Sequence, residues 1–168
     1  MSAIQLSADG KGVSAISDML NITRLHNSVM AISGMRRVLA LSRDFSNRRV
    51  AFGKKISELP LQIQVLGDLE RRYRGNLLFV LNAAKLLGKI ENGIASTSEK
   101  RIYRIMTPVM KLFTAKESVA FISEGLESFG AMGYMENSHI PVYLRDAQVL
   151  PIWEGTTNVL SLDLIRAI

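Results

Sequence analysis

Three long stretches of helical periodicity constrain the fold of this chain more than any other feature. Apolar residues recur at steps of three or four that keep them on one stripe of a helix. The first stripe comprises Leu25, Val29, Ile32, Met35, Leu39 and Phe45, and the second comprises Leu66, Leu69, Tyr73, Leu77, Val80, Ala84 and Leu87. The third comprises Ile102, Ile105, Val109, Leu112, Val119, Ile122, Leu126 and Phe129. Alternating, strand-like runs are nearly absent, so the sequence predicts an all-α fold.

Helix breakers and caps divide the three stretches. Gly53 and Pro60 bracket the connection between the first two helices, because glycine and proline both resist a continued helix. Ser96 and Glu99 have the spacing of a capping box, in which each side chain satisfies a free backbone donor at the start of the third helix. Gly130 is well placed to end that helix. Short links between long helices predict that neighbouring helices are antiparallel.

The remaining segments complete a predicted antiparallel (up-down) four-helix bundle. Pro108 lies inside the third helix and should kink it, because proline removes a donor and clashes with the preceding turn. A shorter fourth helix should follow Gly155 and run to the end. Residues 1–168 are interpreted as a single domain, in which residues 1–20 form a loop and short helix leading into the bundle. Because the first residues resemble a loop from the middle of a protein, we expect the chain to be part of a longer one.

Composition excludes several kinds of site. The chain has no cysteine, so a disulfide framework, a thiolate zinc site and a cysteine nucleophile are excluded. With His26 and His139 as its two histidines, we expect no metal site. The net charge of +6 favours phosphates, whether on nucleic acid, on an anionic membrane or on a nucleotide cofactor. No window approaches the roughly 20 apolar residues of a membrane span.

The most informative segment is the last quarter, FGAMGYMENSHIPVYLRDAQVLPIWEGTTNVLSLDLIRAI. Its glycines permit a tight turn with close backbone approach to a ligand, and Arg145 and Asp146 are candidates for a local ion pair. Glu154 follows Trp153 at the entry of the last helix, and an apolar setting there would make the carboxylate a stronger base. Alternatively, Glu154 stabilises the helix dipole and has no chemical role. The residues alone leave both interpretations open.

Several motifs in register resemble the C-terminal domain of the acyl-CoA dehydrogenase family. In that family a glycine-rich turn is followed by an Arg-Asp pair and then by an aromatic-Glu-Gly-Thr motif, here Trp153 to Thr156. Upstream, Thr23-Arg24 and Arg49-x-x-Phe52-Gly53 match in the same order. The resemblance extends from Asn21 to Ile168, and it implies the helical C-terminal domain of a flavoprotein.

The resemblance implies an FAD-dependent oxidoreductase of fatty acid metabolism that acts on CH-CH groups. Glu154 takes the position of the catalytic base, which removes a proton from the α-carbon of an acyl-CoA thioester while the β-carbon gives a hydride to flavin N5. Other branches of the family carry their base at the position of Thr23, and threonine cannot do that work. This chain alone lacks the other domains of the family's flavin site, so we expect it to be inactive by itself.

The resemblance also implies binding residues and partners. Residues matching the cofactor contacts are Arg49, Phe52, Glu127 and Gly130, which face the FAD of a neighbouring subunit, and Thr156 and Asn158. Residues on the substrate side are Thr23, Arg24, Gly155 and Arg166. The implied partners are an acyl-CoA substrate, an electron-transfer flavoprotein or another acceptor, and further copies of the chain in a homodimer or homotetramer. The implied location is the mitochondrial matrix in a eukaryote or the cytoplasm in a bacterium, for a soluble protein.

Departures from the family pattern point toward its alkylation-response branch. Glu127 stands where many relatives carry glutamine, Leu59 replaces a polar residue, and Trp153 replaces a commoner tyrosine. These features, with Thr107-Pro108 and Lys116, resemble the branch that keeps flavin but is poor at ordinary dehydrogenation. The alternative function is therefore a flavoprotein that binds nucleic acid or senses acyl ligands with little turnover.

Three further features each have a functional and a structural interpretation. Lys116 on the third helix marks a polar pocket, or, as we favour, it lies at the edge of the bundle and extends its ammonium group to solvent. His26 faces a substrate or, as we favour, is a structural histidine that lies on the helix surface or is partly buried. The cluster Arg71-Arg72-Tyr73-Arg74 binds nucleic acid phosphates or, as we favour, forms a solvated helix face or an intersubunit salt-bridge patch.

Overall fold

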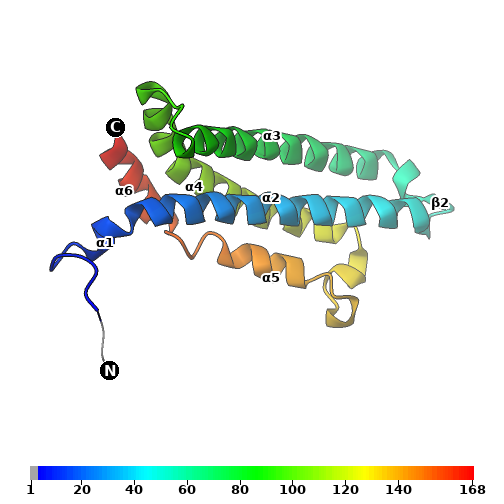
Figure 1. Ribbon diagram of the computed structural model, residues 1–168. Helices are drawn as coiled ribbons and strands as arrows, with labels where there is room; N and C mark the ends of the chain where they lie inside the picture. The colour runs from blue at the N-terminus through cyan, green and yellow to red at the C-terminus, as the bar shows by residue number, and fades with distance from the viewer. Residues whose placement is uncertain (1–3) are drawn as a thin grey trace.

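The structure is a computed structural model that describes residues 4–168, and of Asp18 the backbone only. Three long helices, α2 (Ser17–Arg48), α3 (Pro60–Glu91) and α4 (Thr97–Glu127), lie side by side, with each running opposite to the one before it (Figure 1). Three shorter helices are α1 (Gly12–Ala15), α5 (Val142–Val149) and α6 (Thr157–Ala167). Short 3-10 turns are η1 (Ile56–Glu58), η2 (Gly130–Gly133) and η3 (Glu136–Ser138). The predicted all-α class is confirmed.

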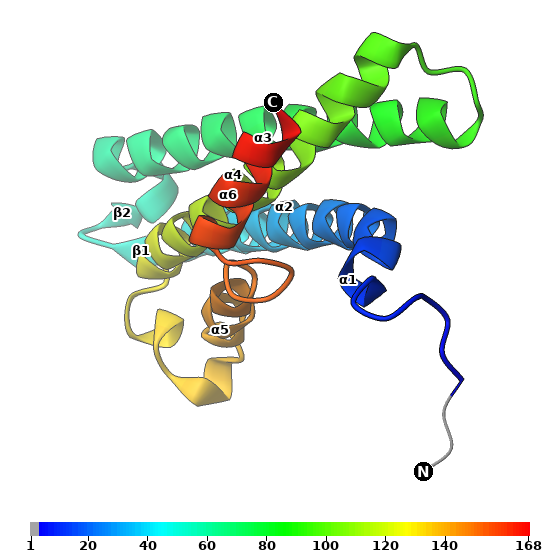
Figure 2. The ribbon, with the colours of Figure 1, turned by 90° about the vertical axis from the view of Figure 1, so that its left-hand side faces the viewer.

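The fourth position of the bundle differs from the sequence prediction. The last helix, α6, crosses α4 at one end and does not run the length of the bundle (Figure 2). The space beneath α2 and α4 is filled instead by α5, a helix that was not predicted (Figure 1). Helix α5 has only 8 residues and lies between Pro141 and Pro151, so its apolar positions are too few to show a period.

A short hairpin connects α2 to α3. Strands β1 (Val50–Ala51) and β2 (Lys54–Lys55) pair antiparallel. The two residues between them, Phe52 and Gly53, have positive φ angles of 52° and 77°, as the tight turns of hairpins require. Pro60 is the first residue of α3, where its missing N–H has no helical partner to lose. Pro60 begins α3 as predicted, whereas Gly53 lies within the connection, because α2 already ends at Arg48.

The predicted boundaries of α4 also hold. Ser96 Oγ accepts from the Glu99 amide at 3.2 Å, and the Ser96 amide donates to Glu99 Oε2 at 2.9 Å, which completes the capping box. Helix α4 ends at Glu127, shortly before Gly130 with its φ of 58°. The helix continues through Pro108, which is buried.

Helices α2 and α4 share the closest packing in the fold. A Cβ on Gly125 would lie 2.4 Å from Val38 Cγ1, so α4 approaches α2 where a larger residue has no room. Small hydroxyl residues fill much of the remaining seam, and Thr107 and Thr114 donate to carbonyls of their own helix. Buried apolar residues from the long helices and α5 form the main core: Met35, Val38, Leu39, Leu69, Phe121, Ile122, Leu126 and Ala147.

This seam explains where the predicted stripes were wrong. Val29 is exposed, although the rest of the first stripe is at least partly buried. In the first half of α4 the predicted Ile102 and Val109 face outward, while Tyr103 and Met110 are buried. The buried residues of that half are Tyr103, Thr107, Pro108, Met110 and Lys111, so the buried face includes polar side chains and apolar periodicity pointed to the wrong side.

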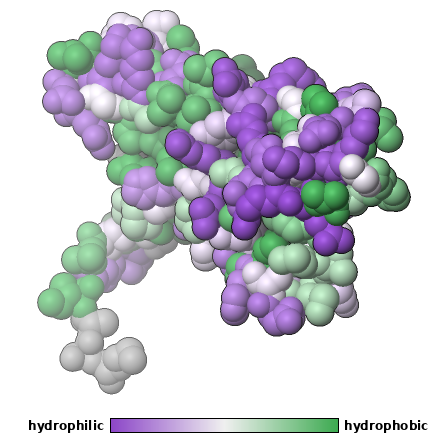
Figure 3. All heavy atoms as spheres, turned by 90° about the vertical axis from the view of Figure 1, so that its right-hand side faces the viewer, coloured by the Kyte–Doolittle hydropathy of each residue, from purple (hydrophilic) through white to green (hydrophobic). Residues whose placement is uncertain are grey.

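Large apolar side chains remain exposed on the outer faces of the fold. Leu61 and Leu78 on α3 and Leu162 and Ile165 on α6 are each more than half exposed. From the hairpin end, hydrophobic residues are interspersed with a mostly hydrophilic surface (Figure 3). Within residues 4–168, no helix is long and apolar enough to cross a membrane, and no group of three potential ligands could hold a metal ion.

Candidate functional site

Glu154 lies in a left-handed turn between α5 and α6. Its φ is 57° and that of Gly155 is 104°. A positive φ is uncommon for a residue with a side chain, and it persists only where the surroundings hold it. A Cβ on Gly155 would lie 3.1 Å from Leu160 Cδ2, so glycine is favoured by both backbone and space. Glu154 thus precedes Thr156, the N-cap residue of α6, and is not itself in the helix.

The carboxylate of Glu154 is held by the start of α2. Thr23 Oγ1 donates to Glu154 Oε2 at 2.6 Å, a contact between residues 131 positions apart in the sequence. The expected apolar setting is wrong for this chain, because Ile152 and Trp153 are 63% and 44% exposed. The carboxylate is partly buried next to a hydroxyl, since the turn directs it toward α2.

Both carbonyls of the turn accept hydrogen bonds from buried cationic side chains. Arg24 Nε donates to the Glu154 carbonyl at 3.3 Å, and Lys111 Nζ donates to the Gly155 carbonyl at 2.6 Å. Lys111 has no exposed surface. Burial and the nearby Arg24 charge lower the pKa of Lys111 to about 8, although the Glu154 carboxylate acts in the opposite direction.

Asp163 on α6 ties the turn to α2 and α4. Its carboxylate accepts from Arg24 Nη1 at 2.6 Å and from Arg104 at 2.5 and 3.2 Å. Burial alone would raise the pKa of Asp163, but the hydrogen bonds from Arg104 and Arg24 together hold it below its usual value. Three elements therefore converge on this carboxylate.

A depression of about 650 Å³ opens beside these residues, and Arg166 lines it together with Arg24, Arg104 and Asp163. Arg166 is exposed in the last turn of α6. Thr156 and Asn158 are exposed at the start of α6. The structure therefore brings Thr23 and Arg24 to the turn that contains Gly155, and Thr156 and Asn158 directly follow it. Arg166 lies at the far end of α6, beside the Arg24–Asp163 pair.

The other four predicted cofactor residues lie at the opposite end of α2. Arg49, Phe52, Glu127 and Gly130 line one depression of about 520 Å³ between the hairpin and the end of α4. Phe52 is 93% exposed, so the strained hairpin turn presents its ring to the outside. Because Thr23 and Arg48 are near opposite ends of one helix, the two sites lie roughly 40 Å apart at a rise of about 1.5 Å per residue.

Comparison with known proteins supports one assignment. Residues 10–168 match the family described as "Acyl-CoA dehydrogenase, C-terminal domain". The chain belongs to the acyl-CoA dehydrogenase family. It is 50% identical to acyl-CoA dehydrogenase family member 11 of Caenorhabditis elegans, over 98% of this chain and 27% of that protein. It is 28% identical to AidB of Escherichia coli, over 97% of this chain and 29% of that protein. The chain therefore spans less than a third of the length of these two relatives.

Solved structures show the same fold. A crystal structure of Caenorhabditis elegans ACDH-11, in complex with C11-CoA, superposes on this acyl-CoA dehydrogenase domain with a TM-score of 0.93, over 96% of this chain and 27% of that one. The apo form of Bd2924 superposes with a TM-score of 0.92 at 50% identity, over 96% of this chain and 32% of that one. The Megasphaera elsdenii butyryl-CoA dehydrogenase shares the fold at 24% identity, with a TM-score of 0.73 and coverage of 94% of this chain and 39% of that one.

Lys111, Arg104 and Asp163 were not predicted as site residues of this acyl-CoA dehydrogenase domain. Lys116 is exposed, in agreement with the favoured interpretation of a lysine that reaches solvent. Lys111 lies one residue after Met110 and one turn after Thr107, so a search for the polar side of the α2–α4 seam would have found it. Asp163 had no signal of its own, because its partners come from distant parts of the chain.

The other side chains with two interpretations are also placed. His26 is exposed, in agreement with the structural interpretation. In the basic cluster Arg71 pairs with Asp68, Arg72 with Glu117 and Arg74 with Glu70, all within the chain. Arg71 and Arg74 are exposed, in agreement with the solvated helix face.

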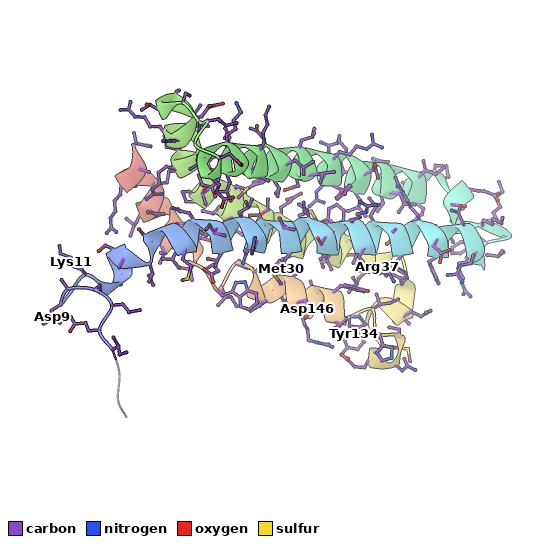
Figure 4. The ribbon with its side chains drawn as sticks, in the orientation of Figure 1. Asp9, Lys11, Met30, Arg37, Tyr134 and Asp146 are labelled. Atoms are coloured by element: carbon purple, nitrogen blue, oxygen red, sulfur yellow. The ribbon has the colours of Figure 1, made fainter. Side chains whose placement is uncertain are left out.

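The predicted pairing of Arg145 with Asp146 is wrong. Arg145 binds both carboxylate oxygens of Glu136, at 2.6 and 3.0 Å. Asp146 is exposed on α5 (Figure 4). Successive helix residues do not face each other, so the pair had the wrong spacing.

Proposed function

We propose that the complete protein is an FAD-dependent acyl-CoA dehydrogenase in which Glu154 is the α-proton base. The observation that carries the proposal is the fixed carboxylate: it is bound by Thr23 at 2.6 Å and lies on a left-handed turn. A base is effective when its position is set before the substrate arrives. The C11-CoA complex of ACDH-11 supports an acyl-CoA as the substrate.

The chain's part in the reaction is proton transfer. Glu154 Oε2 accepts the Thr23 hydrogen bond, and among the described residues no side chain donates to Oε1. Oε1 is the atom that we expect to take the proton from the α-carbon. When FAD is bound, it accepts the hydride from the β-carbon, so that a carbon–carbon double bond remains.

The residues of the hairpin end fit an FAD site. Arg49 is exposed and supplies a guanidinium, which suits a pyrophosphate. Phe52 supplies an exposed aromatic ring, and Gly130 leaves open space, since a Cβ there would meet no atom within 4 Å. Glu127 adds an acidic group to the same depression, which disfavours direct contact with a phosphate. We infer that Arg49 binds the phosphates and that Glu127 lies beside them.

The distance between the two sites supports an assembly. Thr156 and Asn158 at one end and Arg49 and Phe52 at the other are too far apart to touch the same FAD. We infer that each FAD is completed by two subunits of a homodimer or homotetramer, as exposed apolar faces on α3 and α6 also favour. The reduced flavin would pass its electrons to an electron-transfer flavoprotein or another acceptor.

The test is flavin reduction by acyl-CoA in the complete protein, measured by rapid mixing. Glu154→Gln keeps the shape of the side chain and a hydrogen-bond acceptor for Thr23, but it cannot take the proton. We expect bound flavin and acyl-CoA affinity to be retained and the reduction rate to fall by about 10²–10⁴-fold, as for other lost general bases. Equal rates in the variant and the natural protein would contradict the assignment of Glu154.

A second candidate is an acyl-ligand sensor or nucleic-acid-binding flavoprotein with little turnover. The departures from the family pattern at Glu127 and Trp153 are the observations that favour it. The paired state of Arg71, Arg72 and Arg74 weighs against the nucleic-acid version. If no acyl-CoA reduces the flavin of the natural protein, the sensing function becomes the better one, and salt-dependent duplex binding would identify the nucleic-acid version.

A further inference from the structure

Lys111 is a fully buried lysine whose ammonium contacts the backbone of the Glu154 turn. Nζ donates to the Gly155 carbonyl at 2.6 Å, and the residue has no exposed surface. Among the described residues it forms no ion pair, so its charge is matched only by a carbonyl dipole and by the nearby Glu154. Burying a charge with so little compensation is costly. A methionine or leucine at this place in the seam would carry no such cost.

The Gly155 carbonyl, which accepts this hydrogen bond, belongs to the turn that sets the direction of the Glu154 side chain. Glu154 and Gly155 both have positive φ, and a turn of this kind persists only when its surroundings hold it. Arg24 holds the first carbonyl through a longer bond of 3.3 Å, and Lys111 holds the second through a shorter one. The α4 anchor is therefore the stronger of the two.

We propose that Lys111 is a positioning residue: its hydrogen bond to the Gly155 carbonyl holds the turn, and thereby the Glu154 carboxylate, in place. This inference rests on the proposed role of Glu154 for its functional consequence, but the holding of the turn is independent of turnover. Lys111 has no exposed surface, and its hydrogen-bond partner among residues 4–168 is the Gly155 carbonyl, so it acts on the Glu154 carboxylate through the turn.

The test compares Lys111→Met with Lys116→Met in the complete protein. Methionine keeps most of the unbranched shape and loses the donor. Lys116 lies on the same helix and is exposed, so its replacement controls for the loss of one positive charge. Lys111→Gln, which is shorter but keeps a donor, is the second variant if the methionine variant does not fold with bound flavin.

Two readouts separate the proposal from a purely structural role. Amide hydrogen exchange of a peptide spanning residues 151–159 should be faster in Lys111→Met than in the natural protein or the Lys116 control. The limiting rate of flavin reduction should fall by about 10- to 100-fold, as expected for a misplaced catalytic group, while the dissociation constant for acyl-CoA changes less. A uniform loss of flavin and of thermal stability, with an unchanged reduction rate per bound flavin, would overturn the proposal.

The outcomes also separate this proposal from that for Glu154. If the natural protein is not reduced by acyl-CoA, or Glu154→Gln is reduced at the natural rate, the base assignment fails, and the exchange experiment still decides whether Lys111 holds the turn. Unchanged exchange in Lys111→Met refutes the holding. Faster exchange with an unchanged reduction rate, in a protein where Glu154→Gln is slow, refutes the link between the turn and the base.

Discussion

The two ends of helix α2 are built in opposite ways. At the Glu154 end, α2, α4, α6 and the turn are joined by hydrogen bonds among Thr23, Arg24, Lys111 and Asp163. At the hairpin end, Arg49 and Phe52 are exposed. Phe52 lies in the two-residue turn of the hairpin, and its ring faces outward from the described part of the chain. The chain therefore pre-organises the proposed base by itself, whereas it leaves the proposed cofactor residues open to another partner.

The largest expected effect on the unfolding free energy is at Asp163. Asp163→Asn keeps the shape but removes the charge that Arg24 and Arg104 share. Breaking a buried pair costs about 3–5 kcal/mol, and because Asp163 is 20% exposed we expect about 2–3 kcal/mol of lost unfolding free energy. Chemical denaturation measures it. The matched control is Asp44→Asn, whose exposed pair with Arg48 should contribute under about 1 kcal/mol. Equal effects would contradict the claimed difference between the two ends.

Acid should weaken the same end of the molecule. The pKa of Asp163 is lowered in the folded state, so its stabilising contribution is present above the unfolded pKa of about 3.9 and is lost as the pH falls through the folded value. Denaturation midpoints should therefore fall below about pH 4. Asp163→Asn should show a smaller fall over the same range. An identical acid dependence would show that other carboxyl groups account for it.

Two glycines with positive φ give a second comparison between the ends. Gly155 and Gly130 have φ angles of 104° and 58°, but only at Gly155 would a Cβ meet neighbours, with Leu160 Cδ2 at 3.1 Å. Gly155→Ala should cost about 2 kcal/mol of stability through crowding and backbone strain. Gly130→Ala should cost about 1 kcal/mol, from the backbone alone. A larger loss at Gly130 would mean that the hairpin end is the more tightly packed one.

The same difference explains what the sequence could predict. The long helices, the capping box at Ser96 and the start of α3 at Pro60 follow from local periodicity and helix-terminus chemistry, so they were predicted correctly. The hairpin around Gly53 was not predicted. Glu154 and Thr23 were found through the family resemblance, but their direct contact depends on residues 131 positions apart. Lys111 and Asp163 were missed because buried charges obey no sequence period and take their meaning from partners on other helices.

The smallest expected effect on the unfolding free energy is at Arg49. Arg49 is exposed and forms no ion pair among the described residues. If the hairpin end binds FAD and contributes little to the fold, Arg49→Gln should therefore leave the unfolding free energy of the flavin-free protein unchanged. Its loss should instead weaken flavin binding by about tenfold, or about 1.4 kcal/mol, the range of one charge-assisted hydrogen bond to a phosphate. Flavin titration of the complete, flavin-stripped protein measures this. Arg101→Gln, an exposed arginine on α4 far from the hairpin, is the matched control for charge. Equal weakening in both variants would indicate a general effect of net charge, and unchanged flavin affinity in Arg49→Gln would remove the hairpin end from the proposed cofactor site.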